Sequence, residues 1–265
     1  MDDFDPLFGE PQMEIPLPES PLTYVVAQLQ FEPIMQLGSQ EFIAPLQEQV
    51  RSDYPKLERQ QIQIPNLLVG GESQTEFLWR FQSVDSGWRL AISRGFLALE
   101  TRIYTSRSDF MRRFKEAIAI FKATVKTAHV IRLGVRYVDH IRPPAFDQLA
   151  DMIHPGMLGI LNTRLRPDLQ YGVNEITCQA TEGTLVAKWG LLPANGTHDP
   201  NAIEPIPGQQ SWFLDIDAFK HYAESPQQLD VDAMHELGIS LATRSYAFFR
   251  WATTETLLRT YGAKL

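Results

Sequence analysis

The sequence contains a single cysteine, Cys178, among 265 residues. One thiol excludes a disulfide within the chain and any metal site built from several cysteines of one chain. Cys178 stands in a strand-like run of residues, so we expect it to be a small, buried apolar side chain.

Long apolar runs are also absent. Nowhere do about 18 uncharged apolar residues follow one another, so no membrane-spanning helix is expected. The first residues, MDDFDPLFGEPQMEIPLPESPL, have neither the basic start nor the apolar stretch that is typical of a secretory signal peptide. We therefore expect a cytoplasmic protein.

The sequence lacks the short motifs of familiar catalytic and cofactor sites. It has no Walker-A loop, no GxGxxG and no GxSxG, and its six histidines form neither HxxxH nor HExxH. No cofactor is expected. A Ser/His/Asp triad assembled from distant residues stays open, because the sequence alone cannot exclude it.

The overall composition is that of a globular protein. The chain is 44% hydrophobic and 21% charged, with a formal net charge of −8. This net negative charge argues against a protein whose whole surface binds nucleic acid, although it is compatible with a local basic site. The length suits one large domain or two smaller ones that share a core.

Residues 1–21 form an acidic segment with five prolines, which we call the arm. Proline keeps a chain extended and removes backbone donors, so we expect no regular structure here. Apolar residues are spaced along the arm and can anchor it to a surface. Docking on a neighbouring subunit, and hence a homo-oligomer, is one expectation.

Residues 22–142 have the pattern of an N-terminal α+β half. The expected elements, in order, are a strand at 23–31, a helix at 39–54, strands at 75–85 and 87–104 joined by a turn at 85–87, a helix at 107–127 and a strand at 131–141. Arg94-Gly95 should divide the second of the paired strands in two. This order resembles a ferredoxin-like unit with an additional strand.

Residues 143–265 repeat the theme as a C-terminal α+β half. We expect a helix from 145, a hairpin turning at 182–183, a polar loop at 193–210, a strand at 211–219 and helices at 231–252 and 254–262. The predicted fold class is α+β, with antiparallel sheets covered by helices on one face. Two arrangements of the ferredoxin-like-related halves stay open: they share one extended sheet, or each forms its own.

Several stretches are similar to those of a known group of proteins. They are PLTYVVAQLQFEPI (21–34), Tyr54-Pro55, LETRIYTSRSDF (99–110), RLGVRYVDHI (132–141) and LDIDAF with HELGISLATRSYAFFRWATTETLLRTYG near the C-terminus. Together they resemble a sporadically distributed bacterial family of proteins of similar length that has no established activity. The resemblance implies architecture and bacterial origin and carries no catalytic residue across. This chain departs from it at Asp139, where that family usually has Asn.

Segment 102–142 is basic within an acidic chain. It holds ten cations against three acids, for a local charge of +7, which leaves −15 for the remainder. Arg112 and Arg113, on the predicted helix, are candidate ligands for an acidic peptide, a nucleotide or a nucleic acid. The alternative is a solvated helix face with ion pairs inside the chain.

Arg132, Arg136 and His140 share one face of the strand at 131–141. Residues four apart on a strand lie about 13 Å apart, which suits an extended ligand or several acidic partners. Gly134 between the arginines allows close approach of a backbone. We take the three residues as candidate anion ligands, and cross-strand ion pairing as the alternative reading.

Asp215 and Asp217 share one face of the strand at 211–219, as paired metal-binding carboxylates do in phosphoryl-transfer sites. They are the candidate metal ligands, although a plain strand with a polar outer face explains them too. The favoured function is non-catalytic binding of a protein partner. The patchy distribution of the resembling family suggests that the protein belongs to a defence or toxin-neutralising module. The alternative is a nucleotide- or nucleic-acid-binding enzyme or sensor.

Overall fold

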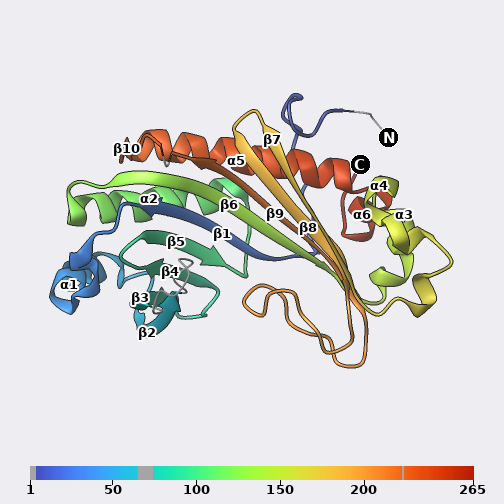
Figure 1. Ribbon diagram of the computed structural model, residues 1–265, viewed down its shortest axis with the longest axis horizontal. Helices are drawn as coiled ribbons and strands as arrows, with labels where there is room; N and C mark the ends of the chain where they lie inside the picture. The colour runs from blue at the N-terminus through green and yellow to red at the C-terminus, as the bar shows by residue number, and fades with distance from the viewer. Residues whose placement is uncertain (1–3, 65–73, 223) are drawn as a thin grey trace. The chain divides into compact units, whose positions relative to one another are not determined.

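The computed structural model describes residues 4–64, 74–222 and 224–265. Within these residues, ten strands form an antiparallel sheet in the order β2-β3-β4-β5-β1-β6-β9-β8-β7, with β10 paired to β6. Helices accompany the sheet, so the predicted α+β class is confirmed (Figure 1). No helix in these ranges is both long and apolar enough to cross a membrane.

The chain divides into two compact units. Unit 1 contains residues 1–25, 135–219 and 240–265, and unit 2 contains residues 26–134 and 220–239. This division differs from the consecutive halves 22–142 and 143–265 that the sequence suggested. The difference arises because β1 (Leu22–Phe31), β6 (His129–Ile141) and α5 (Val231–Ala252) each contribute residues to both units.

Unit 2 holds the first meander of strands. Its remaining elements are η1 (Met35–Gly38), α1 (Gln40–Val50), β2 (Lys56–Ile64), β3 (Gln74–Gln82), β4 (Trp88–Ile92), β5 (Phe96–Thr101), α2 (Arg107–Val125) and β10 (Gln227–Gln228). β1 lies between β5 and β6 in the strand order, which is the central pairing of a ferredoxin-like unit. Asp85 accepts a hydrogen bond from the Gly87 amide in the predicted turn, and the predicted break at Arg94-Gly95 separates β4 from β5.

Helix α2 covers one face of the sheet in unit 2. The Ser106 side chain accepts a hydrogen bond from the Asp109 amide and so caps the first turn. Phe121 then packs against Phe31 of β1, with ring centroids 4.7 Å apart, and Phe110 stacks on Trp88 of β4 at 5.9 Å. The buried residues of this helix, Phe110, Met111, Phe114, Ala117, Ile118 and Phe121, form its packing face.

Unit 1 holds the second meander. Its elements include η2 (Ala145–Gln148), α3 (Leu149–Met152), α4 (Pro155–Leu158), η3 (Gly159–Asn162), η4 (Arg166–Asp168), β7 (Gly172–Ala180), β8 (Gly183–Leu192), β9 (Ser211–His221) and α6 (Glu255–Thr260). The helix expected from residue 145 is thus several short turns, because extended backbone at Ile153 interrupts it before Pro155.

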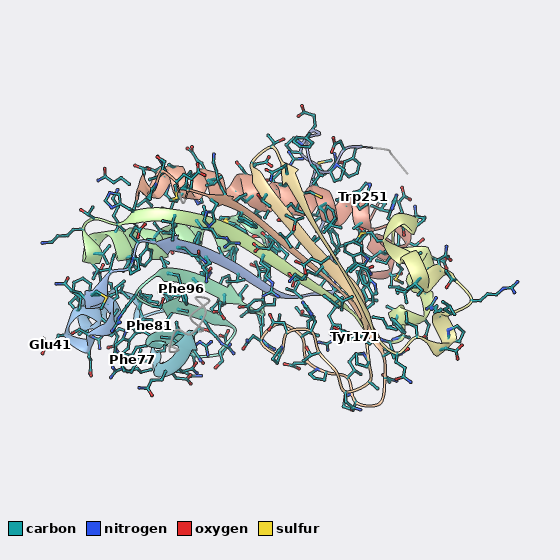
Figure 2. The ribbon with its side chains drawn as sticks, in the orientation of Figure 1. Glu41, Phe77, Phe81, Phe96, Tyr171 and Trp251 are labelled. Atoms are coloured by element: carbon teal, nitrogen blue, oxygen red, sulfur yellow. The ribbon has the colours of Figure 1, made fainter. Side chains whose placement is uncertain are left out.

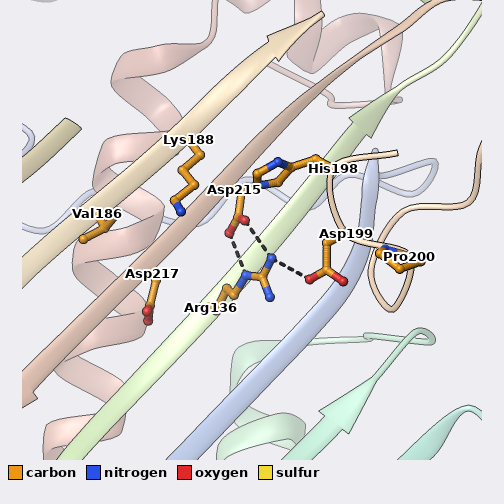
Figure 3. Close-up of a pocket in the computed structure, with 8 residues that line it drawn as sticks. All are labelled: Arg136, Val186, Lys188, His198, Asp199, Pro200, Asp215 and Asp217. Carbon is orange, nitrogen blue, oxygen red and sulfur yellow. Dashed lines mark hydrogen bonds and ion pairs between the residues drawn. The ribbon is translucent and has the colours of Figure 1, made fainter. Parts of the chain in front are cut away.

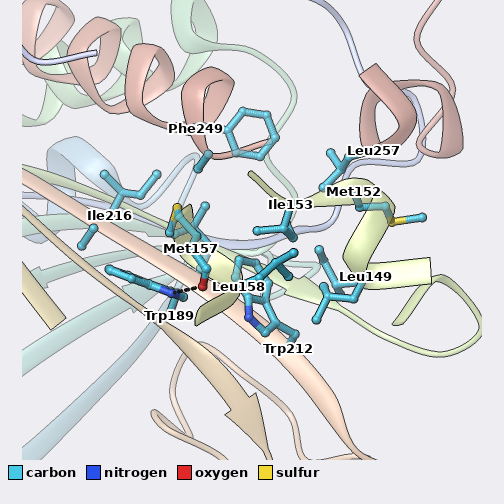
Figure 4. Close-up of a cluster of buried hydrophobic side chains, with 14 of the residues drawn as sticks. Leu149, Met152, Ile153, Met157, Leu158, Trp189, Trp212, Ile216, Phe249 and Leu257 are labelled. Atoms are coloured by element: carbon cyan, nitrogen blue, oxygen red, sulfur yellow. Dashed lines mark hydrogen bonds between the residues drawn. The ribbon is translucent and has the colours of Figure 1, made fainter. Parts of the chain in front are cut away.

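One face of the unit 1 sheet carries the core. Trp212, Leu214 and Ile216 alternate along β9 and are buried with Phe248 and Phe249 of α5 (Figure 4). The short helices α3, α4 and α6 also contribute buried residues to this core cluster. The indole N–H of Trp189 on β8 donates to the Met157 carbonyl of α4 at 2.7 Å. Alternation along a strand puts the intervening side chains on the opposite face, which no helix of this cluster covers.

The arm lies against unit 1, beside α5 and the β7–β8 hairpin (Figure 1). The buried Arg244 of α5 donates through Nη1 to the carbonyls of Pro6 and Gly9, both at 3.1 Å. It also forms a bidentate pair with Glu182. Leu7, Ile15 and Leu17 pack on the core cluster of their own chain, whereas Phe8 is 61% exposed.

Candidate functional site

A pocket of about 410 Å³ opens on the polar face of unit 1. Charged and polar side chains from two strands and one loop meet a single arginine from β6 there (Figure 3). The lining consists of Arg136, Val186, Lys188, His198, Asp199, Pro200, Asp215 and Asp217.

The strand register puts these side chains together. Asp215 and Asp217 of β9 lie directly opposite Lys188 and Val186 of β8. All four have the parity opposite to that of the core residues on the same strands, so they face away from α5. The predicted sharing of one strand face by the two aspartates is therefore observed, and it forms the floor of the pocket.

The loop at 193–210 forms a fixed wall. The ring of His198 stacks on Phe213 of β9, with centroids 4.7 Å apart. Ala202 and Ile203 are buried, and the Thr23 hydroxyl donates to the Ala202 carbonyl at 3.1 Å. These contacts hold Asp199 and Pro200 over the strands without any regular structure in the loop.

Arg136 joins the floor to the wall. Its Nε and Nη2 donate to the two oxygens of Asp215 at 2.8 and 2.7 Å, and Nη2 also donates to Asp199 at 2.9 Å. Burial lowers the pKa of Arg136, but the two carboxylates outweigh it and hold the pKa above its ordinary value. The guanidinium is thus charged and oriented by three hydrogen bonds, and the described contacts leave Nη1 without an acceptor.

The balance of charge in the pocket is acidic. Three aspartates line it with two cations, and the Lys188 ammonium is itself 3.3 Å from Glu175 of β7. Burial raises the pKa of Asp199, but the Asn201 amide and then the Arg136 guanidinium lower it by more, so this carboxyl is ionised at neutral pH. The lining of the pocket therefore has more acidic side chains than basic ones.

His140 shares a strand face with Arg136 but does not line the pocket. It is buried, its Nε2 lies 2.8 Å from the Ser211 hydroxyl, and Arg142 Nε donates to its Nδ1 at 3.1 Å. Burial, and then the charge of Arg142, lower the pKa of His140 to about 4. A neutral ring that accepts at Nδ1 carries its proton on Nε2, so it donates to Ser211 and cannot take that hydroxyl's proton.

The other predicted anion ligands belong to unit 2. Arg112 donates to Asp109 and Glu116 at 2.7 and 2.8 Å, and Arg113 pairs with Asp109 while lying over the Trp88 ring. The guanidinium of Arg132 folds back over Gly134, within 2.6 Å of where a β-carbon would stand. The structure therefore brings Arg136 together with Asp215 and Asp217, and the residues that line this pocket do not include Arg112, Arg113 or Arg132.

Metal binding at Asp215 and Asp217 lacks further ligands in the described residues. Both oxygens of Asp215 accept from Arg136. Across residues 4–64, 74–222 and 224–265, no three His, Cys, Asp or Glu side chains are grouped so that they could hold a metal ion. The metal assignment stays a prediction, with no third ligand to extend it.

Sequence reasoning missed four polar members of this part of the fold. The sequence indicated only that Lys188 is a polar residue in a strand. His198 and Asp199 lie in a loop, where no periodic pattern predicts which side chains meet. Asp139 is buried on the core face, and burial, then the charge of Asp215, raise its pKa to about 7. Its signal was available, because it has the parity of the apolar residues on β6.

No protein-family model matches the chain, and no curated protein matches it either.

Proposed function

We propose that this chain is a non-catalytic, cytoplasmic bacterial binding protein that holds a basic group of a protein partner in the unit 1 pocket. The observation that carries the proposal is the surplus of carboxylates around an arginine that two of them already neutralise. An ammonium or guanidinium from the partner supplies the missing positive charge.

Electrostatics favour this ligand over an anion. A phosphate in the pocket would meet the donors of Arg136 and Lys188, but it would lie among Asp199, Asp215 and Asp217 as well. Like charges at short range cost several kcal/mol in a partly desolvated site. A cation meets the opposite balance, because three carboxylates and two basic side chains line the pocket.

The size and construction of the pocket also suit a side chain. Ligand sites usually enclose about 300–1,000 Å³, and this pocket lies near the lower end of that range. Its floor is a paired sheet and its wall is pinned by His198 and Arg136, so little ordering is required on binding. The apolar surfaces of Val186 and Pro200 can receive the aliphatic stem of a lysine or arginine.

Calorimetric titration tests the proposal against the nucleotide alternative. The probes are short lysine- and arginine-containing peptides, an acidic peptide, and ATP with and without Mn²⁺. We expect only the basic peptides to bind, and Asp217→Asn to weaken them about tenfold, in line with the loss of one charge-assisted hydrogen bond. Asp151→Asn, at an exposed aspartate of the same unit outside the pocket, is the matched control.

Three outcomes would contradict the proposal. Binding of ATP in preference to basic peptides would favour the nucleotide sensor, and a requirement for Mn²⁺ that disappears in Asp215→Asn would favour a metal-dependent site. Equal affinity of the basic peptides for the Asp217→Asn and Asp151→Asn variants would place their contact outside the pocket.

A further inference from the structure

Strand β7 stands at the end of the strand order. It pairs with β8 over its whole length, from Gly172↔Leu191 to Ala180↔Gly183, without a skipped residue. No other strand in the described part of the chain pairs with it. About half of the N–H and C=O groups of an edge strand point outward, so β7 presents an unpaired row of them.

The sequence of β7 lacks the features that usually protect such an edge, and the arm meets the hairpin at the residue after β7, where the Thr181 amide donates to the Leu7 carbonyl. Natural edges carry lysine, proline, a bulge or a very short strand. β7 is nine residues long, reads GVNEITCQA, and has one charged residue, Glu175, which Lys188 of β8 already holds. The edge strand at the other end of the order, β2, begins KLER, so it has the charges that β7 lacks.

We infer that β7 pairs with β7 of a second copy, in antiparallel register, around a twofold axis at Ile176. An axis perpendicular to the sheet keeps each face continuous, and facing residues then have numbers that add to a constant. Centring the pair on Ile176 uses all nine residues of both strands. The proposed pairing does not depend on which ligand binds the pocket.

The side chains select this register. On the polar face, Glu175 lies opposite Thr177 of the second copy. On the other face, the two Ile176 side chains meet each other, and Ile176 is already packed against the edge of the core cluster. A register centred on Glu175 would instead oppose two carboxylates, which destabilises a strand pair. Tyr171, labelled in Figure 2, precedes β7 and is 55% exposed.

Sedimentation equilibrium of the full chain, over a wide range of concentration, tests the pairing. We expect a monomer–dimer equilibrium for the natural sequence and a monomer for Ile176→Lys, because a lysine at the axis opposes its own copy. Ile160→Lys makes the same change at a half-exposed isoleucine of unit 1 outside β7 and should still dimerise. A natural chain that is monomeric at every concentration, or a dimer that survives Ile176→Lys, overturns the inference.

Disulfide trapping gives a second measurement that does not depend on the folding of Ile176→Lys. In a Cys178→Ser background, I176C brings two thiols together across the axis, where facing Cα atoms are about 4.5–5.5 Å apart and within disulfide reach. N174C is the control, because two such residues are offset by four positions, or about 13 Å. Mild oxidation should link I176C alone, and equal linking of the two variants rejects the register.

Discussion

Arg136 of unit 1 and Arg112 of unit 2 were both candidate anion ligands, and the structure gives them different surroundings. Arg136 is mostly buried and is held by carboxylates 63 and 79 residues away in the chain. Arg112 is exposed and pairs with Asp109 and Glu116 of its own helix. An arginine thus holds a site together in unit 1 and lies on the solvent-exposed face of a helix in unit 2. The difference matters because burial decides how much an ion pair contributes to stability.

Replacing Arg136 gives the largest expected effect. Arg136→Glu leaves Asp215 and Asp199 uncompensated and adds a third carboxylate beside them, so unfolding should become easier by about 3–5 kcal/mol. Urea denaturation measures the loss. Arg132→Glu is the comparison on the same strand. An unchanged midpoint for Arg136→Glu would mean that the arginine is available to a ligand and does not hold the site.

Asp139→Asn should stabilise the protein at neutral and higher pH. The pKa of Asp139 is about 7 in the folded protein and 3.8 ordinarily, so its contribution is most favourable below about pH 4 and is lost as the pH rises to 7. The gain above pH 7 is at most on the order of 4 kcal/mol. The melting temperature of Asp139→Asn should exceed that of the natural chain by an amount that grows from pH 4 to pH 8. A difference as large at pH 4 as at pH 8 would contradict a proton-linked cause. Asp151→Asn, exposed in the same unit, serves as the control.

Removing Arg244, the buried arginine of α5 that holds the arm, comes next. Arg244→Met leaves Glu182 and two carbonyls of the arm without their donor. We expect the free energy of unfolding to fall by about 3 kcal/mol, the lower end for a broken buried pair, because Glu182 lies close enough to the surface to be rehydrated. Limited proteolysis should also cut the arm before the rest of the chain. Arg259→Met removes an exposed helix pair with Glu255 and is the matched control. Intact arms in both variants would show that the apolar anchors suffice.

The smallest expected effect is at Arg112. Arg112→Gln removes two ion pairs that lie in solvent, so its melting temperature should match that of the natural chain within error, at low salt as well as high. A clear, salt-dependent fall would mean that charge on α2 contributes to folding. The contrast between the two arginines would then be one of degree.

The sequence predicted those features that depend on local periodicity. α2 and α5 begin where the patterns indicated, β4 and β5 separate at Arg94-Gly95, and Asp215 and Asp217 share a face. These follow from periods of 3.6 and 2.0 residues and from turn chemistry.

Partners distant in sequence were beyond such reasoning. Nothing near Arg136 indicates that it meets Asp215 or Asp199, because strand order sets that meeting, and a polar loop supplies the second carboxylate. His140 shows the same limit in another way. Its position on the strand face was right, but Ser211 and Arg142 enclose it.

The way Arg244 holds the arm has a consequence for how the chain tolerates change. Arg244 contacts main-chain carbonyls of Pro6 and Gly9, and carbonyls are common to every residue type. Phe8 and Met13, by contrast, are 61% and 86% exposed. Arm side chains of that kind are open to evolutionary drift and to laboratory modification, so a dye or an affinity handle at Met13 should leave the attachment intact. The least regular part of unit 1 is in this respect the easiest part to redesign.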